Sequence, residues 1–205
     1  MRINKKKFIY LISPNKISNL DFYIDLCAVL ETKKISFFQL RLKNTANKKK
    51  LLIGKKIKKI CKKYNVNFII NDDPILARKL NADGCHLGQK DMKINEARKI
   101  LKNKIIGITC HNSTKLAKIA ISNKADYLAI GAFHASKTKK ITYKAKINTL
   151  HLIKKISKIP IVAIGGINSN NYKKLLLNNA NFLAISSYIW NNKKYKPSEA
   201  IRKIK

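Results

Sequence analysis

Short runs of apolar residues alternate along the chain with longer stretches in which apolar and lysine positions follow a helical period. The apolar runs are continuous, which is typical of strands that are buried on both faces of a parallel sheet. We expect eight strands, over Phe8–Ser13, Ser36–Leu42, Asn67–Asn71, Gly84–Leu87, Ile105–Thr109, Tyr127–Gly131, Ile161–Ile164 and Phe182–Ser186. We expect helices over Leu20–Leu30, Lys48–Tyr64, Pro74–Leu80, Ile94–Leu101, Thr114–Asn123, Lys146–Ile156, Asn170–Leu177 and Pro197–Ile204.

This strict alternation of strands and helices indicates right-handed crossovers between parallel strands. Eight repeats of the unit predict an α/β protein with a single domain over residues 1–205, folded as a closed (β/α)8 TIM barrel. A doubly wound open sheet is the alternative, but no GxGxxG motif follows the first strand.

The composition is that of a globular protein, with 45% hydrophobic residues and a formal net charge of +35. Such a charge would suit a nucleic-acid-binding protein. However, the lysines are spread over nearly every predicted helix, and arginine, which reads bases bidentately, is scarce. We therefore expect a solvated lysine-rich surface, without a specific nucleic acid or a membrane as partner.

The spacing of the cysteines and the length of the apolar windows bear on where in the cell the protein is expected. The four cysteines show neither CxxC nor zinc-like spacing, so we expect reduced thiols in a cytoplasmic protein. No apolar window approaches the length of a membrane span. A homodimer is compatible with the sequence.

Polar residues and glycines gather where the predicted strands end, whereas the strand bodies are apolar. The carboxyl ends of barrel strands surround one mouth, which is where active sites of this fold lie. The residues expected there are Gln39, Arg41, Lys43, Asn71, Asp72, Asp91, Thr109, His111, Ser136, Thr138, Lys139, Gly166, Ser186 and Ser187.

Two kinds of chemistry are indicated by this set. Gly165-Gly166 and Ser186-Ser187 follow the last two strands, where such barrels commonly bind phosphate through backbone N–H groups. A tight turn is the other interpretation of the glycine pair. The charged residues predict a magnesium–diphosphate site, with carboxylates for the metal and cations for the remaining oxygens. They are Arg41, Lys43, Asp72, Asp91 and Lys139.

Several neighbouring residues have more than one interpretation. Asp73 precedes Pro74 and is expected to cap a helix. His111 could act in proton transfer, bind a phosphate or serve a structural role. His86 is expected to pack near the barrel rim, and His134 fits either a structural or a functional role.

Several motifs along the chain together resemble the thiamine phosphate synthase family, within the superfamily that also contains thiazole tautomerases. The resemblance extends from Tyr10 to Trp190 and is similar to the alphaproteobacterial form. Its motifs are FQLRLK (Phe38–Lys43), IND (Ile70–Asp72), DGCHLGQKD (Asp83–Asp91), IGITCH (Ile106–His111), ADYLAIGAF (Ala125–Phe133), TK (Thr138-Lys139) and VAIGGI (Val162–Ile167).

This resemblance implies a transferase of thiamine biosynthesis. It would join hydroxymethylpyrimidine diphosphate to hydroxyethylthiazole phosphate by a dissociative mechanism, releasing diphosphate with the help of Mg²⁺. Matching positions imply that the pyrimidine diphosphate is held by Gln39, Arg41, Lys43, Asn71, Thr109 and Lys139, among which Arg41, Lys43 and Lys139 are the catalytic cations. They also imply metal ligands at Asp72 and Asp91, and thiazole phosphate ligands at Ser136, Thr138, Gly166, Ser186 and Ser187.

The chain departs from the family pattern at a few positions. Leu42 stands where the family usually has Glu, and the loop His134-Ala-Ser136 replaces a proline-containing one. These changes bear on substrate contacts more than on the reaction class. Two alternatives remain, a thiazole tautomerase, which would not need the diphosphate site, and a noncatalytic lysine-rich barrel that binds nucleic acid.

Overall fold

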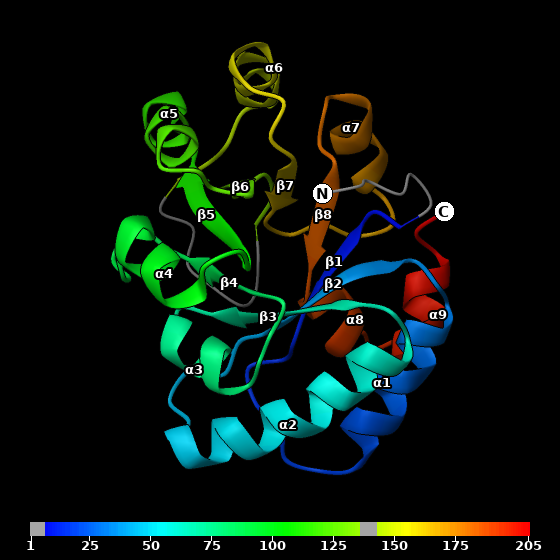
Figure 1. The fold of residues 1–205 in the computed structure, drawn as a ribbon. Helices are drawn as coiled ribbons and strands as arrows, with labels where there is room; N and C mark the ends of the chain where they lie inside the picture. The colour runs from blue at the N-terminus through cyan, green and yellow to red at the C-terminus, as the bar shows by residue number, and fades with distance from the viewer. Residues whose placement is uncertain (1–6, 136–142) are drawn as a thin grey trace.

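The computed structural model describes residues 7–135 and 143–205, and in these residues eight parallel strands close into a barrel in sequence order (Figure 1). The strands are β1 (Ile9–Ile12), β2 (Ile35–Leu40), β3 (Asn67–Asn71), β4 (Gly84–Leu87), β5 (Ile105–His111), β6 (Tyr127–Gly131), β7 (Ile161–Ile164) and β8 (Phe182–Ile185). The predicted TIM barrel is confirmed.

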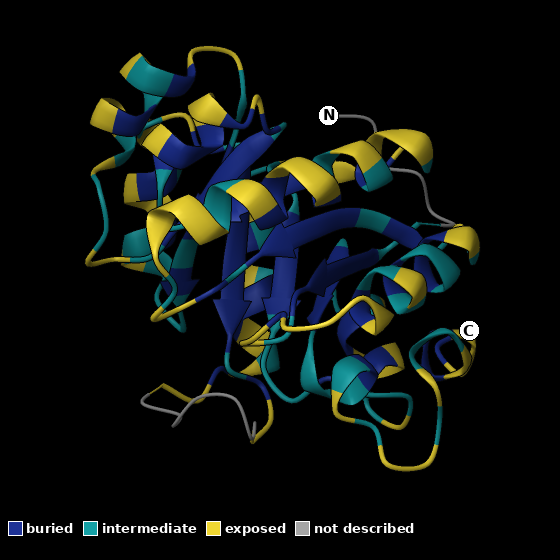
Figure 2. Cartoon of the chain, turned by 90° about the horizontal axis from the view of Figure 1, so that it is seen from below, coloured by how far each residue is buried: buried dark blue, intermediate teal, exposed yellow. Residues whose placement is uncertain are grey.

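Helices connect the strands and form the outer layer of the barrel. They are α1 (Asp21–Glu31), α2 (Asn47–Lys63), α3 (Pro74–Lys79), α4 (Ile94–Leu101), α5 (Thr114–Ser122), α6 (Ile147–Ile156), α7 (Tyr172–Leu177), α8 (Ser187–Trp190) and α9 (Pro197–Arg202). Their outer faces are exposed and their inner faces are buried against the strands (Figure 2).

Successive residues of each strand point to opposite faces, and this alternation separates two apolar layers. Ile9 and Leu11 of β1 belong to the large layer between strands and helices. Tyr10 and Ile12 of the same strand belong to a smaller cluster inside the barrel. The interior cluster therefore forms the floor beneath the carboxyl ends of the strands.

Several element boundaries differ from the sequence-based expectation by one or two residues, and two of these differences lie at the site. Strand β5 continues to His111 instead of ending at Thr109. Ser186, expected as the end of the last strand, is the N-cap of the short helix α8, which was not predicted. A helix of four residues is too short to show a helical period.

The expected helix cap at Asp73 is confirmed, since its Oδ1 accepts a hydrogen bond of 2.8 Å from the backbone N–H of Leu76. Leu42, which stands where Glu is usual, is 6% exposed and packs in the apolar layer. All four cysteines are free thiols. Within residues 7–135 and 143–205, no helix has both the length and the apolar character needed to cross a bilayer.

Candidate active site

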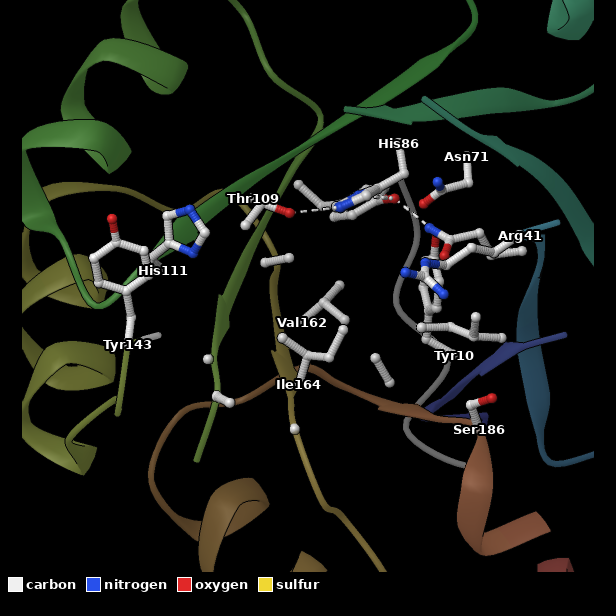
Figure 3. Close-up of a pocket in the computed structure, with 18 of the residues that line it drawn as sticks. Tyr10, Arg41, Asn71, His86, Thr109, His111, Tyr143, Val162, Ile164 and Ser186 are labelled. Atoms are coloured by element: carbon white, nitrogen blue, oxygen red, sulfur yellow. Dashed lines mark hydrogen bonds between the residues drawn. The ribbon is translucent and has the colours of Figure 1, made fainter. Parts of the chain in front are cut away.

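A cavity of about 250 Å³ lies at the carboxyl ends of the strands (Figure 3). The predicted site residues that line it are Gln39, Arg41, Lys43, Asn71, Thr109, His111 and Ser186. They come from β2, β3, β5 and β8 or the segments that follow these strands, so barrel closure gathers them as expected. Ser136, Thr138 and Lys139 lie outside the described residues, and their roles stay predictions.

One wall of the cavity is apolar. It includes Val162 and Ile164 of β7, Ala129 of β6 and Ala184 of β8. In Figure 3, Val162 and Ile164 lie between the polar group around Arg41, Asn71 and His86 and the pair His111–Tyr143. A ligand in the cavity would thus contact a dry surface on one side and polar groups on the others.

The basic side of the cavity is built on the segment after β2. The backbone N–H of Arg41 donates to Ser13 Oγ at 2.9 Å, and its guanidinium Nη1 donates to Asn15 Oδ1 at 3.1 Å. These bonds orient Arg41 before a ligand binds. Lys43 is exposed and also lines an adjoining depression with Asn71 and Asp72.

Asp72 and Asp91, which belong to different loops, meet beside these cations. Asp72 has a left-handed backbone (φ 66°), and its N–H donates to the carbonyl of His86 at 2.8 Å. Asp91 Oδ2 accepts from the N–H of Gly88 at 2.7 Å. Burial, followed by the hydrogen bond and charge of Asp91, raises the pKa of Asp72 to about 6, against the opposing effect of nearby Lys43 and Arg41.

This carboxyl pair fits a divalent cation. Within the described residues, no group of three or more His, Cys, Asp or Glu side chains is arranged to hold a metal. Mg²⁺, however, is usually held by one or two carboxylates and completes its shell with water and substrate phosphate. Asp72 and Asp91 are close enough for one carboxyl group to raise the pKa of the other. An ion bound between them would stabilise both groups in the ionised form.

A chain of hydrogen bonds crosses the barrel interior along the floor of the cavity, and all its members line the cavity. Gln39 Nε2 donates to Tyr10 Oη at 3.1 Å, and Tyr10 Oη lies 2.8 Å from Tyr127 Oη. Tyr127 Oη is 2.9 Å from His86 Nδ1, and His86 Nε2 is 2.8 Å from Thr109 Oγ1. Burial lowers the pKa of His86 to about 4 and raises the pKa of both tyrosines, which keeps all three side chains neutral.

Three members of this chain were not predicted as site residues. His86 was expected at the rim, and Tyr10 and Tyr127 were placed only in strands. The only local signal is a tyrosine within an otherwise apolar strand, in IYLI and YLAIG. A buried tyrosine usually needs a hydrogen-bond partner, but that signal does not identify the partner.

His111 lies on the opposite side of the cavity, at the end of β5. Its backbone is left-handed (φ 52°), and its ring contacts Tyr143 with centroids 4.5 Å apart. Both rings line the cavity (Figure 3).

The loop after β7 requires glycine at both positions of its pair. Gly165 and Gly166 have φ values of 106° and 58°. A Cβ on Gly166 would lie 2.1 Å from the carbonyl oxygen of Ala135, so the loop approaches the segment after β6 backbone to backbone. Gly165 lines the cavity, whereas Gly166 faces this neighbouring segment.

The two serines after β8 differ in position. Ser186 lines the cavity, and its Oγ donates to the carbonyl of Ser13 at 3.1 Å. Ser187 is the first residue of α8 and is not among the lining residues, so its contact with a phosphate stays a prediction.

Comparison with known proteins connects this geometry to one family. The family model for thiamine monophosphate synthase matches residues 9–189. A thiamine-phosphate synthase of Pelagibacter ubique is 70% identical, with 100% of each chain aligned. Another from Nitrosomonas eutropha is 37% identical over 89% of this chain and 86% of its own.

Solved structures show the same architecture. Thiamine phosphate pyrophosphorylase from Pyrococcus furiosus superposes with a TM-score of 0.84 and 29% identity, over 98% of this chain and 94% of that one. The 3-hexulose-6-phosphate synthase of Salmonella typhimurium gives a TM-score of 0.71 at 16% identity, over 96% of both chains, and shows the shared barrel only.

Proposed function

The chain belongs to the thiamine monophosphate synthase family, and we propose that this transferase joins hydroxymethylpyrimidine diphosphate to hydroxyethylthiazole phosphate and releases diphosphate. One observation carries the choice of a diphosphate substrate. The carboxyl groups of Asp72 and Asp91 lie together near Arg41 and Lys43. These two cations line the cavity, and Asp72 lines the adjoining depression together with Lys43. A thiazole tautomerase has no use for that combination.

The cations act on the leaving group. As the bond between the pyrimidine methylene and the diphosphate oxygen breaks, its electron pair leaves with the oxygen and negative charge grows there. Arg41 and Lys43 supply positive charge at that point, and Arg41 is already oriented by Ser13 and Asn15. Donors that need no reorientation stabilise developing charge most effectively.

Asp72 and Asp91 would hold Mg²⁺. The bound ion neutralises diphosphate oxygens and so makes the diphosphate a better leaving group. The support for this assignment is the raised pKa of Asp72 next to the carboxyl group of Asp91.

The apolar wall serves the second half of the reaction. Loss of diphosphate leaves an electron-poor methylene, which water would capture. Val162, Ile164 and Ala129 give this carbon an apolar surrounding that excludes water. The thiazole nitrogen then donates its lone pair to the methylene, and the new C–N bond completes thiamine phosphate.

The phosphate of the thiazole is assigned to the side of β7 and β8. Gly166 and Ser186 support this assignment through their position after these strands, where barrels of this type commonly bind phosphate. Ser136, Thr138 and Ser187 complete the proposed set, and Lys139 is assigned to the pyrimidine diphosphate, as the family resemblance implies.

A coupling assay tests this proposal. The purified chain is mixed with Mg²⁺, both substrates and moderate salt, and thiamine phosphate is oxidised to fluorescent thiochrome. Product that is lost with EDTA and restored by excess Mg²⁺ would support the reaction and the metal together. Folded protein that forms no product, but isomerises a carboxylated thiazole phosphate, would contradict the synthase and favour the tautomerase.

A further inference from the structure

The hydrogen-bond chain along the cavity floor consists of polar side chains, which are unusual in the interior of a barrel. Barrel interiors are normally filled with branched apolar side chains. Here Gln39, Tyr10, Tyr127 and His86 are 2%, 2%, 1% and 8% exposed, and they come from four different strands. Buried polar groups are unfavourable unless each is satisfied, so the whole chain has to be maintained together.

The amide donor of Gln39, together with the number of protons on the other groups, sets the direction of the chain. Each tyrosine has one hydroxyl proton, and an imidazole nitrogen that accepts a hydrogen bond leaves the ring proton on the other nitrogen. Tyr10 accepts from Gln39 Nε2, and among the described residues its own proton has Tyr127 as the only acceptor. Tyr127 then donates to His86 Nδ1, and His86 donates through Nε2 to Thr109 Oγ1.

The two ends of the chain consequently present opposite groups to the cavity. At one end, the carbonyl oxygen of Gln39 has no partner among the described residues and can accept a hydrogen bond. At the other end, Thr109 accepts from His86, so its hydroxyl proton is available to a ligand. The bond between His86 and Thr109 is visible in Figure 3.

We propose that Tyr10, Tyr127 and His86 are positioning residues that fix an acceptor at Gln39 and a donor at Thr109, so that the cavity selects an aminopyrimidine over the corresponding oxopyrimidine. This inference rests on the proposed pyrimidine substrate. An aminopyrimidine has an amine that donates beside a ring nitrogen that accepts. The oxo form has a carbonyl that accepts beside a ring N–H that donates, so both groups are reversed.

A site that hydrogen-bonds its substrate through buried groups can reject the mismatched analogue by roughly 10⁴-fold. We expect a preference of that order in the wild-type chain, measured as the ratio of kcat/KM for the amino and oxo pyrimidine diphosphates. Removing the middle of the chain frees both ends to reorient. Tyr127→Phe should then lower the ratio at least tenfold, mainly by improving the relative use of the oxo substrate.

Tyr10→Phe and Tyr127→Phe each delete one hydroxyl and keep the ring. Phe37→Leu is the matched control, because Phe37 stacks on Tyr10 with centroids 5.2 Å apart in the same buried layer and forms no hydrogen bond through its side chain. The control should lower Tm but retain the substrate ratio. Equal ratios in wild type and both tyrosine variants would overturn the proposal.

A double-mutant cycle tests whether distant members act as a unit. Tyr10 and Thr109 share no hydrogen bond and are linked only through Tyr127 and His86. If the chain transmits orientation, the effects of Tyr10→Phe and Thr109→Val on the substrate ratio will be non-additive, by about fivefold or more. Independent effects, whose product equals the double variant, would contradict a directional chain.

The outcome also separates this inference from the proposed reaction. If wild type forms no thiamine phosphate, the same two pyrimidine diphosphates are compared by calorimetric binding. An amino preference that Tyr127→Phe reduces would then support the positioning chain while the proposed reaction fails. Equal binding of both compounds to the wild-type chain would overturn the chain as well.

Discussion

The carboxyl groups of Asp72 and Asp91 lie within hydrogen-bonding reach of each other, although one follows β3 and the other lies in the loop after β4. Burial and this neighbour together hold the pKa of Asp72 at about 6. The pair is therefore unfavourable when both carboxyl groups are ionised, and a divalent ion bound between them would relieve this repulsion.

Metal affinity should depend on pH because a proton and a cation compete for Asp72. Below a pH of about 6, the apparent affinity for Mg²⁺ should fall, by roughly tenfold per pH unit once Asp72 is mostly protonated. Isothermal titration calorimetry at several pH values between about 5 and 8, on both sides of this pKa, measures the Mg²⁺ affinity. Asp72→Asn should weaken binding and flatten the pH dependence.

Asp73→Asn is the control for that variant. Asp73 caps α3 through Leu76 rather than pairing with Asp91, and Asn is an equally good capping residue. Its metal affinity and pH profile should match wild type. An Asp73 variant that loses the metal as strongly as the Asp72 variant would place the ion elsewhere.

Loss of Lys43 should impair the reaction without unfolding the protein. Lys43→Ala should lower kcat/KM for the pyrimidine diphosphate by roughly 10²-fold, since it removes one of the charges that we propose to stabilise the leaving group. Tm should remain near wild type because the side chain is exposed. Lys118→Ala, on the exposed face of α5, removes the same charge and should leave kcat/KM unchanged.

Global stability should fall in acid because of His86. Folding lowers its pKa from 6.5 to about 4, so the unfolded chain takes up the proton first. The contribution of neutral His86 is complete above pH 6.5 and is lost progressively as the pH falls to about 4, on the order of 3 kcal/mol in total. Urea unfolding at a series of pH values measures it.

Carboxylates also titrate in part of the range between pH 4 and 6.5, so the contribution of His86 has to be measured by comparing wild type with a His86 variant. His86→Gln should show a shallower loss of unfolding free energy between pH 6.5 and 4 than wild type. His151→Gln, which changes a histidine bonded to Asn178 and Asn179 outside the barrel, should keep the wild-type slope. Identical slopes in all three proteins would exclude His86 as the source.

A side chain at Gly166 should damage the proposed phosphate loop. Gly166→Ala combines a left-handed backbone with a contact of 2.1 Å to Ala135, which the loop can relieve only by moving. We expect a loss of about 1–3 kcal/mol in stability and a larger rise in KM for the thiazole phosphate than for the pyrimidine diphosphate.

Gly54→Ala is the matched glycine control. Its new Cβ would meet the end of the flexible Leu80 side chain, and helix α2 favours alanine over glycine. Both KM values should stay near wild type. Parallel changes of the two KM values in Gly166→Ala would argue against a selective role in binding the thiazole phosphate.

Much of the fold follows from local pattern, and the exceptions have local reasons as well. The continuous apolar runs identified all eight strands, because strands covered on both faces contain few polar positions. The end of β5 was placed too early because the polar residues Thr109 and His111 interrupt the apolar run. Helix α8 was missed because its four residues contain barely one turn.

For the site, the sequence by itself determined which polar residues stand at the ends of the strands. Closure of the barrel brings these residues to one mouth, whichever side chains each of them contacts there. The pairing of Tyr10 with Tyr127 was decided only by the tertiary structure. These residues are 117 positions apart, and strand alternation shows merely that each can face inward. Which inward residues meet depends on the stagger of all eight strands around the closed barrel, a property of the whole fold that no single segment contains.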